Sequence, residues 1–245
     1  MADLAPAEND ILCEICGYTL NGLPLSGKCP ECGSEIDLSV SPLLRAPPVW
    51  EDITHYRSSP GRFIRTTVAV IFRTSRFFRS LNARGEAGPA RRFAQIHWMI
   101  ASAMLGMAWW LHWDWYQREI MQMARPAVIR WMLAFLLPML VYLAISTTEW
   151  LAARLTAWEA GYRGYRLPHP VVVRALYYHS ANLLPVAIIA PLTIGGYSFL
   201  EHRRVFPVTS DTAYLYTLSG EIILLPILMF QKYWTAMRNL MYANR

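Results

Sequence analysis

Long runs of apolar side chains alternate with short basic segments through most of the chain, and this pattern predicts helices that cross a membrane. A helix needs roughly 20 mostly apolar residues to cross the hydrocarbon core of a bilayer. Four windows meet this requirement, at residues 93–113, 127–146, 177–200 and 213–231. Tryptophan and tyrosine side chains gather near the ends of these windows, as they do at membrane–water interfaces. We therefore expect a mainly α fold in which residues 93–245 form a bundle of four transmembrane helices.

The segment 61–84 shows a different, amphipathic pattern. At 100° per residue, one side of a helix here carries four arginines and another carries five apolar residues: Arg62, Arg65, Arg73 and Arg76 against Phe63, Val70, Phe77, Phe78 and Leu81. Such a helix is expected to lie in the cytosolic headgroup plane, held by anionic lipid and by burial of its phenylalanines. The alternative is a packed cytosolic helix with a solvated arginine face. The preceding residues 39–60 contain four prolines and are expected to form a semi-extended linker.

The N-terminal segment 1–38 carries the sharpest chemical motif. Its cysteines form two Cys-x2-Cys pairs separated by twelve residues: Cys13, Cys16, Cys29 and Cys32. Each pair is followed by a glycine, so each can form a tight turn whose backbone N–H groups point at the sulfur atoms. Four thiolates suit tetrahedral Zn²⁺, with iron in a rubredoxin-like site and a thiol redox pair as alternatives. Because no position is left open for water, we expect a structural metal that folds a small β zinc ribbon.

Composition agrees with a membrane protein whose cysteines face a reducing compartment. Of the 245 residues, 54% are hydrophobic and 13% aromatic, which is high for a soluble domain. The first residues lack a basic region followed by an apolar one, so we expect no cleaved secretory signal and a cytosolic ribbon. In the reducing cytosol, four cysteines are better explained as metal ligands than as a disulfide framework.

Charge is distributed unevenly along the chain. Residues 1–40 carry a net charge of −6, whereas the remainder carries +12. Phosphate contacts need lysine and arginine, so the acidic ribbon argues against nucleic-acid binding and favours a protein partner, which the sequence does not identify. Seventeen basic residues lie in segments on one side of the predicted spans and four lie on the other side. The positive-inside rule therefore places both termini in the cytosol and the protein in the inner membrane. We also expect the acidic ribbon to dock against the basic helix.

A few ionisable side chains fall inside or close to the predicted spans, where each is a functional candidate. Glu221 and Arg130 lie within roughly two turns of the outer ends of their helices. They could pair across the bundle, or each could extend separately to the interface. His112 and Asp114 are a second pair, suited to a metal or a proton relay, although two residues do not complete a site.

Two stretches of the sequence carry a family resemblance. The ribbon CEICGYTLNGLPLSGKCPECGSEID resembles the ribbon at the front of many bacterial membrane proteins. The basic segment FRTSRFFRSL, followed by a multi-span region, is similar to bacterial members of the Yip family of polytopic membrane proteins. The resemblance implies a multi-span domain, typically with five spans. Eukaryotic members of that family are associated with membrane trafficking and Rab GTPases, and no catalytic residues are established for it.

The motifs taken together favour a protein without catalytic activity. The sequence contains no Ser-His-Asp order, phosphate-binding glycine loop, HExxH motif or paired carboxylates, so no catalytic residues are predicted. The predicted function is an adaptor or scaffold at the cytosolic membrane face, with the zinc ribbon tethered to the bundle. The first alternative is a small transporter or channel that uses Glu221 and kinked helices, with the ribbon as a metal-sensing gate. A membrane-tethered nucleic-acid binder is the second alternative.

Overall fold

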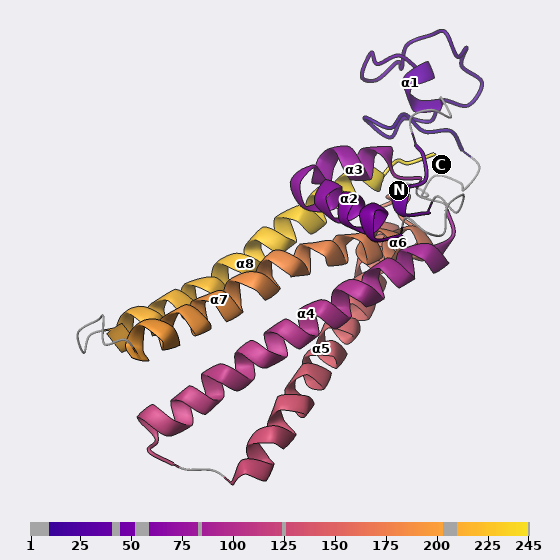
Figure 1. Ribbon diagram of the computed structural model, residues 1–245. Helices are drawn as coiled ribbons and strands as arrows, with labels where there is room; N and C mark the ends of the chain where they lie inside the picture. The colour runs from indigo at the N-terminus through magenta and orange to yellow at the C-terminus, as the bar shows by residue number, and fades with distance from the viewer. Residues whose placement is uncertain are drawn as a thin grey trace. The chain divides into compact units, whose positions relative to one another are not determined.

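The computed structural model describes residues 10–40, 45–51, 59–82, 85–123, 126–202 and 210–244. Over these ranges the chain is mainly helical, as predicted, and its longest helices are α4, α5, α7 and α8 (Figure 1). The chain divides into two compact units. The first comprises residues 1–94, 149–181 and 231–245, and the second comprises residues 95–148 and 182–230. Several long helices therefore contribute one end to each unit.

The first unit contains the cysteine-bearing segment and a group of short helices. Its elements are α1 (Asp37–Val40), η1 (Val49–Glu51), α2 (Ser59–Phe72), α3 (Thr74–Ser80), α6 (His169–His179), and parts of α4 (Ala87–Trp115), α5 (Ala127–Tyr162) and α8 (Ser210–Leu240). Two antiparallel β-bridges, Leu12 with Thr19 and Lys28 with Glu35, are present in the segment 10–40. No strand forms within the described residues of that segment, so the β character that we predicted is limited to these bridges.

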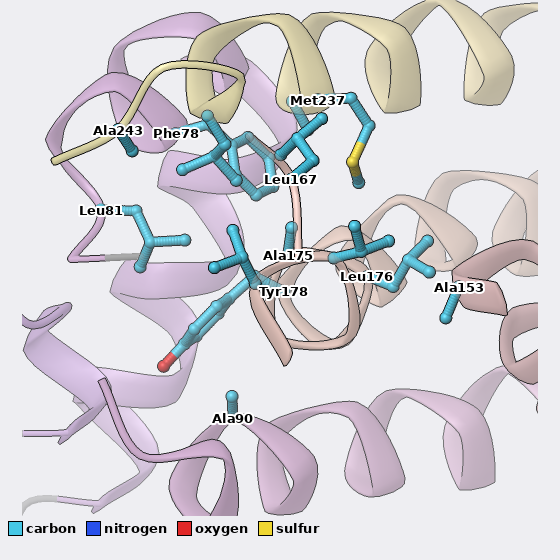
Figure 2. Close-up of a cluster of buried hydrophobic side chains, with 14 of the residues drawn as sticks. Phe78, Leu81, Ala90, Ala153, Leu167, Ala175, Leu176, Tyr178, Met237 and Ala243 are labelled. Atoms are coloured by element: carbon cyan, nitrogen blue, oxygen red, sulfur yellow. The ribbon is translucent and has the colours of Figure 1, made fainter. Parts of the chain in front are cut away.

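The core of the first unit gathers side chains from distant parts of the sequence. Phe78 of α3 and Tyr178 of α6 are fully buried there, and Met237 of α8 joins them (Figure 2). Leu81 and Ala90 belong to the same cluster. At about 25 cal/mol per Å² of apolar surface removed from water, such burial is what holds these short helices together.

The segment 61–84 differs from the single interfacial helix that we predicted. The helix breaks at Arg73, between α2 and α3. Its predicted lipid-facing residues instead join the protein core: Val70, Phe78 and Leu81 are buried, and Phe63 and Phe77 pack against them. The helical wheel identified an apolar face correctly, but a wheel does not say whether lipid or protein covers that face.

A second apolar stripe on α2 is exposed. Ile64, Val68 and Phe72 follow one another at intervals of four residues and expose 60%, 47% and 78% of their surface. Side chains four residues apart lie on the same face of a helix. Arg65 lies beside this stripe and is also exposed. This exposed face of α2 can therefore contact another apolar surface, which the first unit does not supply.

Part of the predicted linker packs against the core of the first unit. Trp50 packs its ring against Phe63 and Phe93, with ring centroids 5.8 and 5.9 Å apart, and donates a hydrogen bond to the carbonyl of Pro89 at 2.7 Å. Glu51 pairs with Arg174 of α6 at 2.7 Å, where both side chains are at least nine-tenths buried. Residues 41–44 and 52–58 of that linker lie outside the described residues.

The second unit consists of the apolar parts of the long helices. Its elements are the remainder of α4, α5 and α8, the π-helix η3 (Tyr116–Ile120), the end of η4 (Ser180–Asn182), and α7 (Leu183–His202). Gly106 of α4 faces Pro138 of α5 so closely that a Cβ atom on Gly106 would lie 2.4 Å from the Pro138 Cα. A small residue on α4 thus permits close helix packing, which is common in membrane bundles.

Among the residues that the structure describes, three helical segments are long and apolar enough to cross a membrane: Ala127–Tyr162, His169–Leu200 and Thr212–Leu240. They contain three of the predicted windows, 127–146, 177–200 and 213–231, which are thus helical and long and apolar enough for the predicted spans. Little of their apolar surface is buried within the protein; Phe135 of α5, for example, is 80% exposed. Such large uncovered apolar surfaces indicate association with a membrane. Residues 93–113 are helical, within α4, but are not among the three segments.

Candidate metal centre

The cysteine-bearing segment consists of two turns of the same design, repeated after sixteen residues. In each turn the glycine after the second cysteine donates its N–H to the carbonyl of the first cysteine, Gly17 to Cys13 at 2.8 Å and Gly33 to Cys29 at 2.9 Å. Both glycines adopt positive φ, 81° and 71°. A side chain at such a position is strained, so glycine is the residue that each turn requires.

The repeat extends beyond the turns themselves. Leu20 donates its N–H to the carbonyl of Ile11, and sixteen residues later Ile36 donates to the carbonyl of Gly27. Leu20 and Ile36 are both buried and form a small core with the cysteines. The regular spacing of the cysteines thus produces two turns of the same backbone design, formed by hydrogen bonds between residues close in sequence.

The four sulfur atoms form a compact group. All lie within 4.8 Å of one another, and two pairs, Cys13 with Cys32 and Cys16 with Cys29, are 3.6 Å apart. These distances are too long for a disulfide, and all four cysteines are free thiols. Tetrahedral Zn²⁺ with Zn–S bonds of about 2.3 Å separates its sulfur ligands by roughly 3.8 Å. The geometry of the four predicted residues is thus compatible with a structural metal ion.

Burial and hydrogen bonding give the thiols different pKa values. Burial raises the pKa of Cys13, but hydrogen bonds from the Ser34 hydroxyl and from the backbone N–H groups of Cys16 and Ile15 outweigh it and lower the pKa to about 6. The Ser34 hydroxyl also lowers the pKa of Cys32. Burial raises the pKa of Cys16 to about 12. A thiolate thus forms readily at Cys13, whereas four neighbouring thiolates need a cation to offset their mutual repulsion.

An arginine that sequence patterns did not single out attaches this segment to the rest of the first unit. Arg45 forms a bidentate ion pair with Glu14, at 2.8 and 2.9 Å. Its remaining N–H groups donate to the carbonyls of Phe78 and Leu81 and to that of Asn239. Arg45 is 7% exposed, so this pair is shielded from solvent and its loss would leave a buried charge unpaired.

The end of the chain makes a second attachment through Asn244. Its side-chain amide donates to the carbonyls of Leu12 and Ser39, at 2.8 and 2.7 Å, and accepts from the N–H of Leu12 at 2.9 Å. Arg166 donates to the same amide oxygen at 2.8 Å. The partners are separated by up to 232 residues in sequence. No periodic pattern in the sequence predicts a contact between residues so far apart, so sequence analysis did not identify it.

The ring of Tyr242 lies against the first cysteine turn. A Cβ atom on Gly17 would come within 2.6 Å of this ring, whereas a Cβ atom on Gly33 would have no neighbour within 4 Å. The two turns are therefore alike in backbone but different in surroundings: one is covered by the C-terminal residues and the other is open.

The ionisable side chains of the second unit form pairs other than those considered from the sequence. Glu221 of α8 accepts a hydrogen bond from Thr193 of α7, and Arg130 of α5 pairs with Asp114 at 2.9 Å. His112 is joined through Nδ1 to the hydroxyl of Tyr214 at 2.7 Å. Neither the Glu221–Arg130 pair nor the His112–Asp114 pair forms among the described residues.

Comparison of the chain with protein-family models, with curated proteins and with solved structures finds no match. The geometry of the cysteine group and of the apolar helices is therefore the basis for inferring a function.

Proposed function

We propose that the chain is a non-enzymatic integral membrane protein in which a zinc ribbon is displayed at the cytosolic face as an adaptor or scaffold. The observation that carries the proposal is the closed group of four cysteine sulfurs, in a segment that Glu14 and Asn244 attach to the rest of the first unit. A site with four sulfur ligands leaves no coordination position for a substrate, so its metal serves the fold. We assign Zn²⁺ to the site because four thiolates and tetrahedral spacing are what this ion prefers.

The membrane part of the proposal has four spans, with α4 as the fourth. This helix has 29 residues, which at 1.5 Å per residue is long enough to cross the bilayer. An even number of spans places both termini on the same side, and the excess of basic residues makes that side the cytosol. A cytosolic N-terminus also keeps the four thiols in a reducing compartment, where they can bind the metal.

The exposed stripe of α2 is the proposed contact with anionic lipid. Ile64, Val68 and Phe72 would enter the headgroup region, and Arg65 would meet lipid phosphates. A photoreactive phenylalanine analogue placed at Phe72 should crosslink to lipid in native membranes. The same analogue at Leu25, which is exposed on the ribbon, should not. Equal lipid crosslinking at both positions would reject the proposed contact.

The adaptor role is tested by comparing the intact protein with a Cys13→Ser variant. We expect about one zinc ion per chain in the intact protein, measured by elemental analysis after purification in detergent with reductant, and none in the variant. Proteins captured from native membranes should include a set that depends on the ribbon. If the protein contains no metal, or if the captured set is unchanged by the substitution, the proposal fails.

A transporter remains the second candidate because of Glu221. One of its carboxylate oxygens is buried without a hydrogen-bond partner among the described residues. An ionisable group in that state is a candidate for proton or ion movement within a membrane. Flux in liposomes that is present in the intact protein and lost in Glu221→Gln would favour this candidate, whereas a scaffold gives no flux in either protein. The resemblance to the Yip family agrees with the first candidate.

A further inference from the structure

A cavity in the second unit is lined by a cluster of polar side chains with no role in the proposed adaptor. The cavity has a volume of about 120 Å³, which is more than a single water requires. It lies at the junction of the end of α4, the π-helix η3 and the start of α5. Its polar and aromatic lining includes Trp110, Trp113, Asp114, Gln117, Arg118 and Arg130.

The charged residues at the cavity have an excess of positive charge. Asp114 is 9% exposed and pairs with Arg118 at 2.6 Å and with Arg130 at 2.9 Å. One carboxylate thus meets two guanidinium groups, which leaves one net positive charge. The Nη1 atoms of both arginines make no hydrogen bond to a described residue, and both side chains are about half exposed. Each arginine can therefore donate to a further group at the cavity.

Gln117 points to a ligand independently of the charges. This residue is only 7% exposed and lines the cavity, yet its side-chain amide makes no hydrogen bond to any described residue. Its amide atoms are not among the fully enclosed polar atoms without a partner, so their hydrogen-bonding capacity is open to a group inside the cavity that Gln117 lines. Gln117 lies in the π-helix η3, and single π-turns of this kind often occur at functional sites.

We propose that this cavity binds a phosphate group. Two guanidinium groups around a buried carboxylate provide charge and paired N–H donors, and the geometry of guanidinium suits phosphate oxygens. The Gln117 amide supplies an additional uncharged donor. The indole rings of Trp110 and Trp113 give the cavity an apolar wall, and further tryptophans nearby, Trp109 and Trp131, are exposed, as is common at headgroup depth. The phosphate can come from a phospholipid headgroup or from free phosphate.

The test is binding of short-chain phosphatidic acid to the full-length protein in detergent, measured by native mass spectrometry. Diacylglycerol with the same acyl chains lacks the phosphate and serves as the ligand control. We expect one phosphatidic acid per chain, with an affinity about tenfold weaker in Arg118→Gln and in Gln117→Leu, since each loses a donor to a charged group. Gln117→Leu leaves all three charged side chains in place, so a loss of binding there does not reflect a broken ion pair.

Arg163→Gln is the matched control variant. Arg163 forms an ion pair with Glu159 four residues earlier, as Arg118 does with Asp114, but it belongs to the first unit. Its substitution should leave binding unchanged. Competition by inorganic phosphate would assign the ligand to free phosphate, and phosphatidic acid binding without such competition would assign it to lipid; both outcomes support the site. Equal binding of diacylglycerol, or binding unaffected by both cavity variants, would overturn it.

Discussion

At the scale of single residues, the two cysteine turns offer a matched comparison. Gly17 and Gly33 both have positive φ and make equivalent backbone hydrogen bonds, but of the two only Gly17 is covered, by the ring of Tyr242. Alanine at Gly33 should cost roughly 1–2 kcal/mol, which is the price of a side chain in the left-handed region. Alanine at Gly17 should cost about 1 kcal/mol more, because the Tyr242 ring must also move.

The readout is the temperature at which the detergent-solubilised protein releases its metal, detected with a colorimetric zinc indicator. In a Tyr242→Ala background the two glycine substitutions should become equal, since the difference between them comes from that ring. A difference that persists without the ring would contradict this explanation.

The residue scale also shows what sequence reasoning could and could not find. The spacing of the four cysteines predicted that their sulfur atoms would gather, and they do, because hydrogen bonds between residues close in sequence form both cysteine turns. Arg45 and Asn244, which attach the ribbon, were missed because their partners lie far away in sequence and no pattern marks them. The unused amide of Gln117 could likewise be recognised only from its burial and surroundings.

At the scale of elements, the packing of α4 against α5 depends on Gly106. Its hypothetical Cβ would meet the backbone of Pro138, which cannot move aside as a flexible side chain could. We expect Gly106→Ala to destabilise the protein by about 1–3 kcal/mol. Gly195 of α7 has open space around it, so Gly195→Ala should be neutral or stabilising by up to about 1 kcal/mol. Thermal unfolding in the same detergent compares the two, and an equal response would argue against close α4–α5 packing.

The hydrogen bonds of Asn244 to the cysteine-bearing segment give a second prediction at this scale. Asn244→Ala removes three hydrogen bonds to Leu12 and Ser39, each worth about 0.5–1.5 kcal/mol net. We expect faster deuterium exchange at the Leu12 amide with no loss of bound metal, because the cysteine turns do not involve Asn244. If Asn244→Ala lost its metal as well as the protection of the Leu12 amide, this explanation would be contradicted.

Asn21→Ala is the control for that experiment. The Asn21 amide also accepts from a ribbon backbone N–H, that of Ile11, but its second partner is Asp10 rather than the C-terminal residues. Its substitution should speed exchange at Ile11 alone. The comparison separates release of the ribbon from a local change inside it.

The helical wheel over 61–84 illustrates why elements were predicted better than their surroundings. Periodicity found the apolar face of α2 and α3, and the structure buries that face in the core of the first unit. The exposed stripe of Ile64, Val68 and Phe72 was overlooked because its residues are interspersed with arginines and threonines. Periodicity reports that a face is apolar, whereas the packing of distant helices determines what covers it.

At the scale of the whole molecule, the number of spans decides where the ribbon and the end of the chain lie. Three spans would place the two ends of the membrane region on opposite sides, whereas four would place them together. We expect four, with α4 crossing despite its polar Gln95, His97 and Ser102, because its 29 residues also include a long apolar and aromatic stretch. The arginine-rich segments before α4 then remain in the cytosol.

Reporter fusions test this topology directly. Alkaline phosphatase, which needs an oxidising compartment for its disulfides, should be active when fused after Gln122 and inactive after Gly164 and after Asn244. Green fluorescent protein at the same positions should give the complementary pattern. If α4 does not cross, all three results invert, because each position then follows one fewer span while the ribbon stays in the cytosol. That inversion would reject the four-span bundle. It would also place Asn244 on the opposite side of the membrane from Leu12, although the two residues are joined by hydrogen bonds. These hydrogen bonds therefore favour an even number of spans.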